Sequence, residues 1–366
     1  MTVNKKKFKI SGKLILNLVV LAISLYLITY FFISENGLID LLLTPNSFNP
    51  WWILVAFLVF EFNTIIDSFV TLIFVRSKYK HFTFTDALKV AFVGVFFSAI
   101  TPSNTGGQPM QLYLMSQKNI NVGFGSACMT QKFIVYQILS TAFSVFAVIT
   151  HFDLFKSAFT GTFSTIFVII GFLVQLLMTA LFLVISFCKR LTNSILKLLD
   201  KLFHKLKFIK EPDKKIERLY KEVEMFHSGN KALFTNPKII ISTYLLVIIQ
   251  IIAIMSVPYL IYISFGMPEI AIANGQTPLS FYDSICIQSF VLFTSNLVPL
   301  PGASGGAELA FTLYFSSFFV VGSINKIKPA ILLWRFVAYY LSLIISSPFS
   351  YFTKGKKSDD ISEVQK

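Results

Sequence analysis

The sequence predicts an all-α, polytopic integral membrane protein with about six full transmembrane helices and two re-entrant or broken-helix pairs that form an inverted repeat. Three observations carry this prediction. The 366 residues have a mean hydropathy of +0.70 and are 55% hydrophobic. Only 14% of them are charged, against roughly 25% in soluble domains. Two apolar stretches are interrupted by Pro and Gly in matching ways.

Six apolar runs reach the length of about 20 residues that a bilayer span needs, at 13–33, 51–75, 124–150, 160–187, 238–264 and 328–350. The segments "KKKFKISGK" before the first run and "RSKYKH" after the second are basic, whereas the 34–50 loop has no Lys or Arg. Because cytoplasmic loops are enriched in Lys and Arg, we expect the N-terminus and 76–81 in the cytoplasm and 34–50 outside. The first run lacks a small-residue cleavage site, so we expect it to be a retained helix.

The net charge of +14 is concentrated in the segments between the apolar runs. This distribution favours contact with anionic lipid headgroups and argues against nucleic acid as a partner. We expect neither a metal nor a cofactor, because the cysteines and histidines are scattered along the chain and no Walker-type phosphate loop is present. These residues are Cys128, Cys188, Cys286, His81, His151, His204 and His227, the histidines being expected at the surface.

Four segments are expected along the chain. They are a first membrane half (1–187, with a broken region at 84–115), a basic cytoplasmic linker (188–237), a second membrane half (238–353, with a broken region at 281–322) and a cytoplasmic tail (354–366). Residues 191–208 of the linker alternate Leu, Ile and Phe with Lys at helical spacing. This pattern fits an amphipathic helix at the membrane surface or a solvated helical linker.

The two broken regions form an internal repeat, "FTDALKVAFVGVFFSAITPSNTGGQP" and "FYDSICIQSFVLFTSNLVPLPGASGGAE". Each begins with an aromatic residue before an Asp and continues through an apolar stretch to Pro, three residues and Gly-Gly. The motif residues are Pro102, Gly106, Gly107 and Pro109 in the first copy, and Pro299, Pro301, Gly302, Gly305 and Gly306 in the second. Because three full spans separate the copies, the second should be inverted relative to the first.

Backbone groups freed by such interruptions cannot face lipid, so they must be buried in protein or line a polar cavity. Inverted repeats with Gly/Pro-interrupted segments indicate a transport site at the repeat interface, and the N-terminus of a broken helix suits a phosphate group. The alternative is that Gly and Pro only kink two ordinary helices.

Several ionisable residues fall within apolar stretches, where each costs roughly 2.5–3.5 kcal/mol to insert. We expect Lys132 and Arg335 to bind the phosphate of a lipid headgroup, Arg335 by a bidentate contact. The acidic residues of the set would balance them or contact a cationic headgroup, and Gln108, which follows the first Gly-Gly, completes the candidate site. The acidic residues are Glu61, Asp67 and Glu308. The alternative is that these charges pair as structural locks or extend to the interface.

The motifs "TPSNTGGQPMQLYLM" and "PLPGASGGAE" closely resemble the membrane part of the lysylphosphatidylglycerol synthetase/flippase family (multiple peptide resistance factor). The resemblance covers about residues 10–350. The family also includes stand-alone flippase-like members. It implies a lipid flippase with re-entrant segments that moves an aminoacylated or glycosylated phospholipid, or a polyprenyl lipid. Two-part members carry a soluble C-terminal domain that transfers an amino acid from tRNA to phosphatidylglycerol. Only a short polar stretch follows the last span, so we expect no such domain here.

Three functions remain open from the sequence. The first is a lipid flippase of the cell membrane that works without ATP on an anionic, aminoacylated (lysyl-phosphatidylglycerol-like) or glycosylated lipid. The second is an enzyme of the phosphatidylglycerol lysyltransferase type, linked to lipid metabolism and cationic peptide resistance, that acts only with a separate catalytic domain. The matched carboxylates Asp86 and Asp283 are its candidates, although an acidic residue is also simply favourable at a helix N-terminus. The third is a non-catalytic partner of a separate synthase, and a homo-oligomer is possible in each case.

Overall fold

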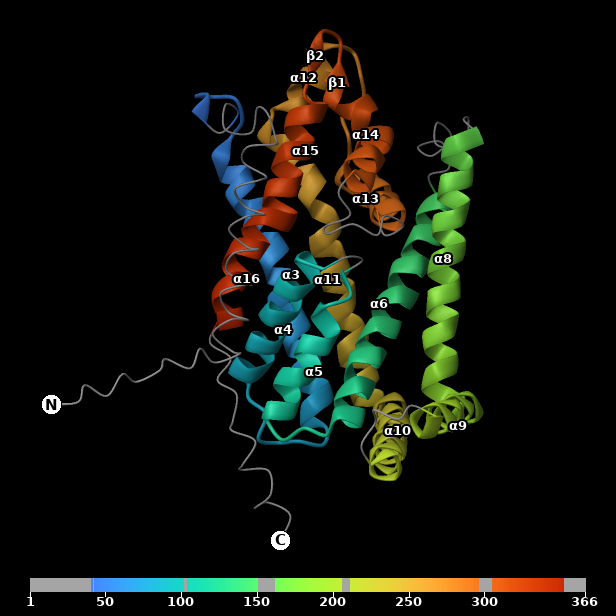
Figure 1. Cartoon of the computed structure of the whole chain (residues 1–366). Helices are drawn as coiled ribbons and strands as arrows, with labels where there is room; N and C mark the ends of the chain where they lie inside the picture. The colour runs from blue at the N-terminus through green and yellow to red at the C-terminus, as the bar shows by residue number, and fades with distance from the viewer. Residues whose placement is uncertain are drawn as a thin grey trace, which may run out of the picture.

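The computed structural model describes residues 41, 43–101, 104–150, 162–205, 211–295 and 305–351. Five helical segments in this part of the chain are long and apolar enough to cross a membrane (Figure 1). They are α3 (Pro50–Arg76), α6 (Val122–Thr150), α8 (Thr162–Phe187), α11 (Pro237–Ser264) and the continuous segment α15–η4–α16. These helices confirm five of the six expected spans, and the expected span at 13–33 and the tail at 354–366 lie outside the described residues.

The last span contains a change of helix type. It begins with α15 (Ile327–Arg335), continues as a π-helical turn, η4 (Phe336–Leu341), and ends with α16 (Ser342–Tyr351). Segments of π-helix inside α-helices are rare and are frequent at functional sites. The π-helical turn begins directly after Arg335, one of the intramembrane charges that the sequence singles out.

Helices α3 and α11 pack against each other along their lengths and run in opposite directions. Both begin with Asn-Pro, and the Asn side chain caps each helix by accepting a backbone hydrogen bond, from Trp51 to Asn49 (3.0 Å) and from Lys238 to Asn236 (3.1 Å). The backbone N–H of Asn49 donates to the carbonyl of Ser264 (2.7 Å), so α3 starts beside the end of α11. This antiparallel pair makes the most extensive helix–helix contact among the described residues.

Each predicted broken region is a helix–break–helix hairpin. The first pairs α4 (Phe84–Ala99) with α5 (Gly107–Gln117), and the second pairs α13 (Phe281–Ser295) with α14 (Gly306–Phe319). These helices have 11 to 16 residues, and at about 1.5 Å per residue none of them crosses a core of roughly 30 Å. Hairpin α4–α5 occupies the lower half of the molecule and α13–α14 the upper half (Figure 1). The two broken-helix pairs of the predicted inverted repeat are therefore present, inserted from opposite ends.

The open end of the first hairpin is fastened by polar contacts. The Thr83 hydroxyl accepts a hydrogen bond from the backbone N–H of Asp86 (3.2 Å), and the Asp86 carboxylate accepts one from the backbone N–H of Thr83 (3.1 Å), which makes a capping box. Lys118, just after α5, forms a salt bridge with Asp86 (2.5 Å). The start of α4 and the end of α5 are thereby held together.

The closed end of this hairpin depends on small residues. The backbone of Gly107 packs directly on α4, where an added Cβ would lie 2.7 Å from the carbonyl oxygen of Gly94. The Thr101 hydroxyl accepts from the backbone N–H of Gly106 (2.8 Å) and donates to the Phe97 carbonyl (2.6 Å). Glycine thus allows the close approach of the two helices, and Thr101 provides a partner for a backbone group that the break leaves unpaired.

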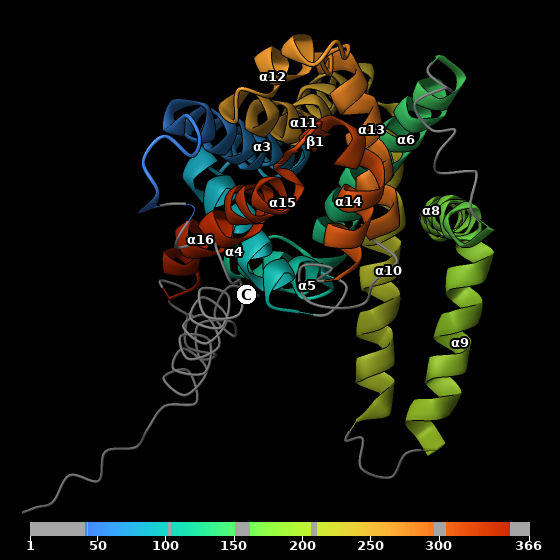
Figure 2. The same ribbon diagram turned by 90° about the horizontal axis from the view of Figure 1, so that it is seen from above.

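Two helices of the linker, α9 (Lys189–Lys205) and α10 (Pro212–Thr235), lie at the lower end of the spans and extend from the bundle to one side (Figure 2). The sequence predicted a helix over 191–208, close to α9, but not α10. Buried polar contacts attach α10 to the spans, since Asn230 accepts from Gln131 on α6 (3.0 Å) and His227 contacts Thr192 on α9 (2.7 Å). The expectation that His227 is a surface residue is wrong, because it is buried in this junction.

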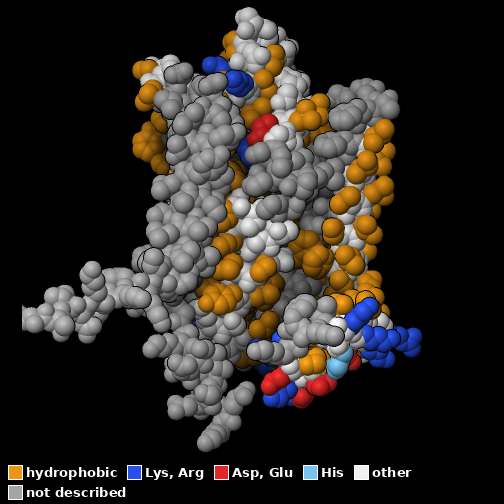
Figure 3. Space-filling view, viewed as in Figure 1, with side chains coloured by type: hydrophobic (Ala, Val, Ile, Leu, Met, Phe, Trp, Pro, Cys, Tyr) orange, Lys and Arg blue, Asp and Glu red, His pale blue; other side chains and the backbone are white. Residues whose placement is uncertain are grey.

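At the upper end, two further elements were not expected from the sequence. They are the short helix α12 (Met267–Ala273) and the two-residue strands β1 (Val320–Val321) and β2 (Ile324–Asn325), paired antiparallel with Val320 opposite Asn325. Along the spans, hydrophobic side chains cover the outward side of α8, whereas charged side chains gather at the lower end over α9 and α10 (Figure 3). This distribution of apolar and charged surface is that of a membrane-embedded protein.

Candidate functional site

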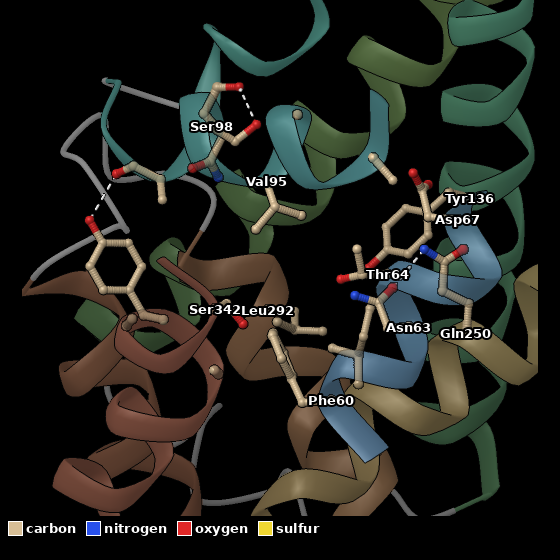
Figure 4. Close-up of a pocket in the computed structure, with 18 of the residues that line it drawn as sticks. Phe60, Asn63, Thr64, Asp67, Val95, Ser98, Tyr136, Gln250, Leu292 and Ser342 are labelled. Carbon is tan, nitrogen blue, oxygen red and sulfur yellow. Dashed lines mark hydrogen bonds between the residues drawn. The ribbon is translucent and has the colours of Figure 1, made fainter. Parts of the chain in front are cut away.

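A cavity of about 480 Å³ lies in the interior, where the two hairpins meet the spans (Figure 4). Side chains from α3, α4, α6, α11, α13 and the last span line it, together with residues of α5 and α14. Its wall includes hydroxyl, amide and charged groups inside a molecule whose outer surface is apolar. The polar residues are Asn63, Thr64, Asp67, Ser98, Asn104, Gln111, Lys132, Tyr136, Gln250, Gln288, Arg335, Tyr339 and Ser342.

One ion pair crosses the cavity wall between α3 and α6. The ammonium of Lys132 lies 2.9 Å from the carboxylate of Asp67 and also donates to the Thr71 hydroxyl (3.3 Å). Both charged side chains are largely buried. A second cavity of about 170 Å³ adjoins this pair, and Gln108 and Gln111 of α5 line it. The Asp67–Lys132 pair therefore stands between two polar compartments.

A second ion pair joins the other hairpin to the last span. The Nε of Arg335 lies 2.8 Å from the carboxylate of Glu308, whose other oxygen accepts from the backbone N–H of Gly305 (2.6 Å). Gly305 has φ of +84°, a conformation that favours glycine. Glu308 thus caps the start of α14 and holds Arg335 at the same time, and the guanidinium also lies 5.0 Å from the ring centroid of Tyr339.

The π-helical turn connects this site to the first hairpin. Tyr339, inside the turn, donates its hydroxyl to the carbonyl of Ala99 at the end of α4 (2.8 Å). Ser342, directly after it, donates to the carboxylate of Glu61 on α3 (2.5 Å). The last span therefore contacts α3, the break in α4 and the start of α14 within a few residues, which makes it the element that joins the two repeats.

The structure brings all six candidate headgroup-binding residues to this region. Asp67, Lys132 and Arg335 line the main cavity, and Gln108 lines the smaller one. Glu308 and Glu61 each contact a lining residue, Arg335 and Ser342 respectively. Of the broken-helix motif residues, Gly106, Gly107, Pro109, Gly305 and Gly306 lie at the starts of α5 and α14. The other four, Pro102, Pro299, Pro301 and Gly302, lie outside the described residues.

Sequence reasoning missed the neutral polar residues of the cavity. Asn63 of α3 and Gln250 of α11 point toward one another and form a hydrogen bond of 2.7 Å (Figure 4). Gln250 stands alone among apolar residues in "LVIIQIIAI", and Gln288 is joined only by Ser289 in the otherwise apolar "ICIQSFVLF". A lone amide inside an apolar run is costly to bury, so this pattern could have identified both residues.

The carboxylates considered for an enzymatic role lie away from the cavity. Asp86 and Asp283 each accept hydrogen bonds at the open end of a hairpin, from Thr83 and from Ser280, the latter at 2.6 Å. Ser280 also caps α13, since its hydroxyl accepts from the backbone N–H of Asp283 (3.1 Å). Within the described residues, no three His, Cys, Asp or Glu side chains gather as metal ligands would.

The spans, the two hairpins inserted from opposite ends and the buried polar cavity define a polytopic α-helical membrane protein built on an internal repeat of broken helices. This class includes proteins with unrelated functions, so the sequence match is informative beyond the architecture. The chain belongs to the family described as the lysylphosphatidylglycerol synthase TM region, which matches residues 15–346.

Three relatives share similarity over most of the chain. A UPF0104 membrane protein of Archaeoglobus fulgidus is 24% identical over 278 residues, covering 72% of this chain and 75% of its own length. The uncharacterized protein MG306 homolog of Mycoplasma pneumoniae is 25% identical over 333 residues, with 88% and 82% covered. The uncharacterized protein MG306 of Mycoplasma genitalium is 23% identical over 346 residues, with 90% and 85% covered. No solved structure matches the chain.

Proposed function

We propose that this protein moves a lipid between the two leaflets of the cell membrane, with the headgroup passing through the cavity and the acyl chains remaining in lipid. The observation that carries the proposal is the cavity of about 480 Å³ that lies between hairpins from opposite ends and has hydroxyl, amide and charged side chains in its wall. A polar headgroup cannot cross hydrocarbon unaided, because its hydrogen-bonding groups would lose their partners. A cavity lined by hydroxyl, amide and charged groups supplies substitutes for them.

The two ion pairs suit an exchange of partners with the substrate. Without a headgroup, each buried charge is neutralised by a neighbour, which avoids the cost of an isolated charge. A lipid phosphate can take the place of the Glu308 carboxylate on Arg335, whose planar guanidinium favours two parallel hydrogen bonds. A cationic headgroup can take the place of Lys132 on Asp67. The substrate class is thus an anionic, aminoacylated (lysyl-phosphatidylglycerol-like) or glycosylated lipid.

We also propose that the lower end of the molecule faces the cytoplasm, with both termini on that side. The linker helices α9 and α10 at this end lie in the basic segment 188–237, where Lys and Arg outnumber Asp and Glu by about two to one. Such segments favour the cytoplasmic leaflet and its anionic lipids. A lipid synthase in a separate chain would then meet the protein on the side where its product is made.

The test is lipid movement in liposomes that contain the purified protein and a fluorescent phospholipid. We expect faster loss of inner-leaflet label than in empty liposomes. Arg335→Ala and Glu308→Ala should each lower the rate at least about tenfold, since the first removes the guanidinium proposed to bind the phosphate and the second removes the carboxylate that positions it. Lys221→Ala is the matched control, because it removes an exposed ion pair with Glu217 (2.8 Å) on α10 and should leave the rate unchanged.

Thermal melting and gel filtration check that each variant is folded. Folded Arg335→Ala and Glu308→Ala variants with the wild-type rate would remove both residues from the transport site. Wild-type protein that moves no anionic, aminoacylated or glycosylated lipid would refute the proposal itself. A lysyl-tRNA transfer assay on the same preparation separates a transport protein from an aminoacyltransferase.

A further inference from the structure

The side chain of Gln288 on α13 lines the cavity and is completely buried. Neither its Oε1 nor its Nε2 has a hydrogen-bond partner among the described residues. Leu292, one turn later on the same helix face, lines the cavity beside it. Gln288 thus holds an unsatisfied donor and an unsatisfied acceptor within the wall of the cavity that Arg335 also lines.

Two other amides and two charges of the cavity wall have partners in the protein. The amides of Asn63 and Gln250 bond to each other, and the charges of Lys132 and Arg335 are held by carboxylates. A buried amide without partners is costly, so proteins retain one where a ligand or solvent supplies the missing contacts. The position of Gln288 on a broken-helix hairpin, in the wall of a cavity that it shares with an arginine, indicates a ligand contact.

The chemistry of that contact follows from the amide. A carboxamide offers both N–H donors and a carbonyl acceptor, and a hydroxyl is a group that can donate and accept in return. A phosphate diester only accepts and an ammonium group only donates, so each satisfies one end of the amide. We propose that Gln288 binds a hydroxyl of the lipid headgroup and selects hydroxyl-bearing headgroups, an inference that rests on the proposed passage of a headgroup through this cavity.

The experiment measures lipid binding, so that its result does not depend on transport. Purified full-length protein in detergent is titrated with short-chain phosphatidylglycerol and with short-chain phosphatidylethanol. The two lipids carry the same phosphodiester charge, but only the first has headgroup hydroxyls. We expect the wild type to bind phosphatidylglycerol roughly tenfold more tightly, which is about the effect of one hydrogen bond made to an otherwise unsatisfied group.

The variant Gln288→Met keeps the size of the side chain and removes the amide. It should bind both lipids with the same affinity, by weakening the binding of phosphatidylglycerol. Ile287→Met is the matched control, because Ile287 precedes Gln288 on α13 but is buried in the hydrophobic core and does not line the cavity, and this variant should keep the preference. If Gln288→Met does not fold, Gln288→Asn retains the amide but withdraws it by one methylene, and it should show a reduced preference.

Equal affinity of the wild type for the two lipids overturns the inference, and so does a folded Gln288→Met or Gln288→Asn variant that keeps the full preference. Liposome assays on the same lipids are interpreted separately. A wild-type preference in binding that disappears in Gln288→Met, without any lipid movement, would retain the assignment of Gln288 and refute the transport function alone.

Discussion

At the scale of single residues, Gly107 sets the distance between the two helices of the first hairpin. We expect Gly107→Ala to destabilise the protein by about 1–3 kcal/mol, the usual cost of overpacking, because the new Cβ would meet the backbone carbonyl of Gly94 at 2.7 Å. The backbone cannot move aside as a flexible side chain could. The measurement is the midpoint of thermal unfolding in detergent.

Gly125→Ala on α6 is the matched control for this prediction. The nearest atoms to its added Cβ belong to the Leu112 side chain at 3.2 Å and the Met115 side chain at 3.4 Å, which can adjust. Alanine is also preferred over glycine inside helices by about 1 kcal/mol. We expect the control to retain the wild-type midpoint or exceed it. A Gly107→Ala protein as stable as the control would contradict the close packing at the hairpin.

His204 at the end of α9 gives a residue-scale prediction outside the membrane. The backbone carbonyl and the carboxylate of Asp200 and the carboxylate of Asp213 surround its ring (2.9 to 3.1 Å), and these hydrogen bonds raise the pKa of His204 above its ordinary 6.5. A pKa raised in the folded state stabilises this corner below the unfolded pKa, and the stabilisation is lost as pH rises through the folded value.

The pKa can be measured by NMR titration of the His204 ring, assigned with a His204→Gln variant. Asp213→Asn should lower it, because the variant replaces a carboxylate partner with a neutral amide. A folded Asp213→Asn protein with an unchanged His204 pKa would show that the corner between α9 and α10 is not closed as described.

At the scale of elements, the structure of helix α9 bears on whether this segment lies at the membrane surface or forms a solvated linker, which its sequence leaves open. Its apolar side chains Ile195, Leu198 and Leu202 are exposed and share one face, with Leu198 at 68% of its maximal exposure. Such a stripe in water would be unfavourable, whereas it suits the boundary between headgroups and acyl chains. Because α9 also runs at a large angle to the span α8, at its lower end, the arrangement favours the interfacial helix over the solvated linker.

A nitroxide spin label distinguishes the two positions of α9 in liposomes. With the native cysteines replaced, a label at Leu198→Cys should be accessible to oxygen and protected from a polar nickel reagent. A label at Lys197→Cys, the exposed neighbouring position, should show the opposite pattern. Equal access of the polar reagent to both labels would support the solvated linker.

The elements also show which parts of the fold the sequence makes predictable. The spans were predictable because lipid imposes long apolar runs, and the hairpins because Pro and Gly interrupt two of them. Helix α10 was not predictable, because it is held in place by contacts of His227 and Asn230 with other helices. The local sequence gives no sign of such contacts. The short helix α12 was not predictable either, because it depends on the geometry of the loop that contains it.

The candidate site also has a part that the sequence could predict and a part that it could not. Charged residues stand out in apolar runs because burial of a charge is expensive, so the sequence could identify Lys132 and Arg335. It could not assign their partners, because Asp67 is 65 residues from Lys132 and is brought to it only by the packing of α3 on α6. Neutral amides such as Gln288 carry a weaker signal than charges, and their unpaired state is visible only in three dimensions.

At the scale of the whole molecule, the inverted repeat predicts opposite accessibility of the two hairpins. Thr85 lies exposed at the open end of the first hairpin, and Thr277 lies exposed just before the second. Single cysteines at these positions, in a chain without its native cysteines, should react with a membrane-impermeant maleimide from opposite sides of oriented vesicles. If both are labelled from the same side, the inversion is wrong.

The hydrogen bond between Asn63 and Gln250 has a consequence for how such a molecule would change shape. Each residue lies 14 positions after the asparagine that caps its helix, on α3 and α11. If α3 and α11 are equivalent helices of the inverted repeat, the two residues occupy equivalent positions, and a contact between equivalent positions lies on the two-fold axis that relates the copies. If the halves exchange conformations, this contact is carried onto itself, whereas the pairs Asp67–Lys132 and Glu308–Arg335 lie off the axis and must be remade. The amide pair would then stay formed throughout the conformational exchange, whereas the ion pairs would break and form again and so stabilise each end state.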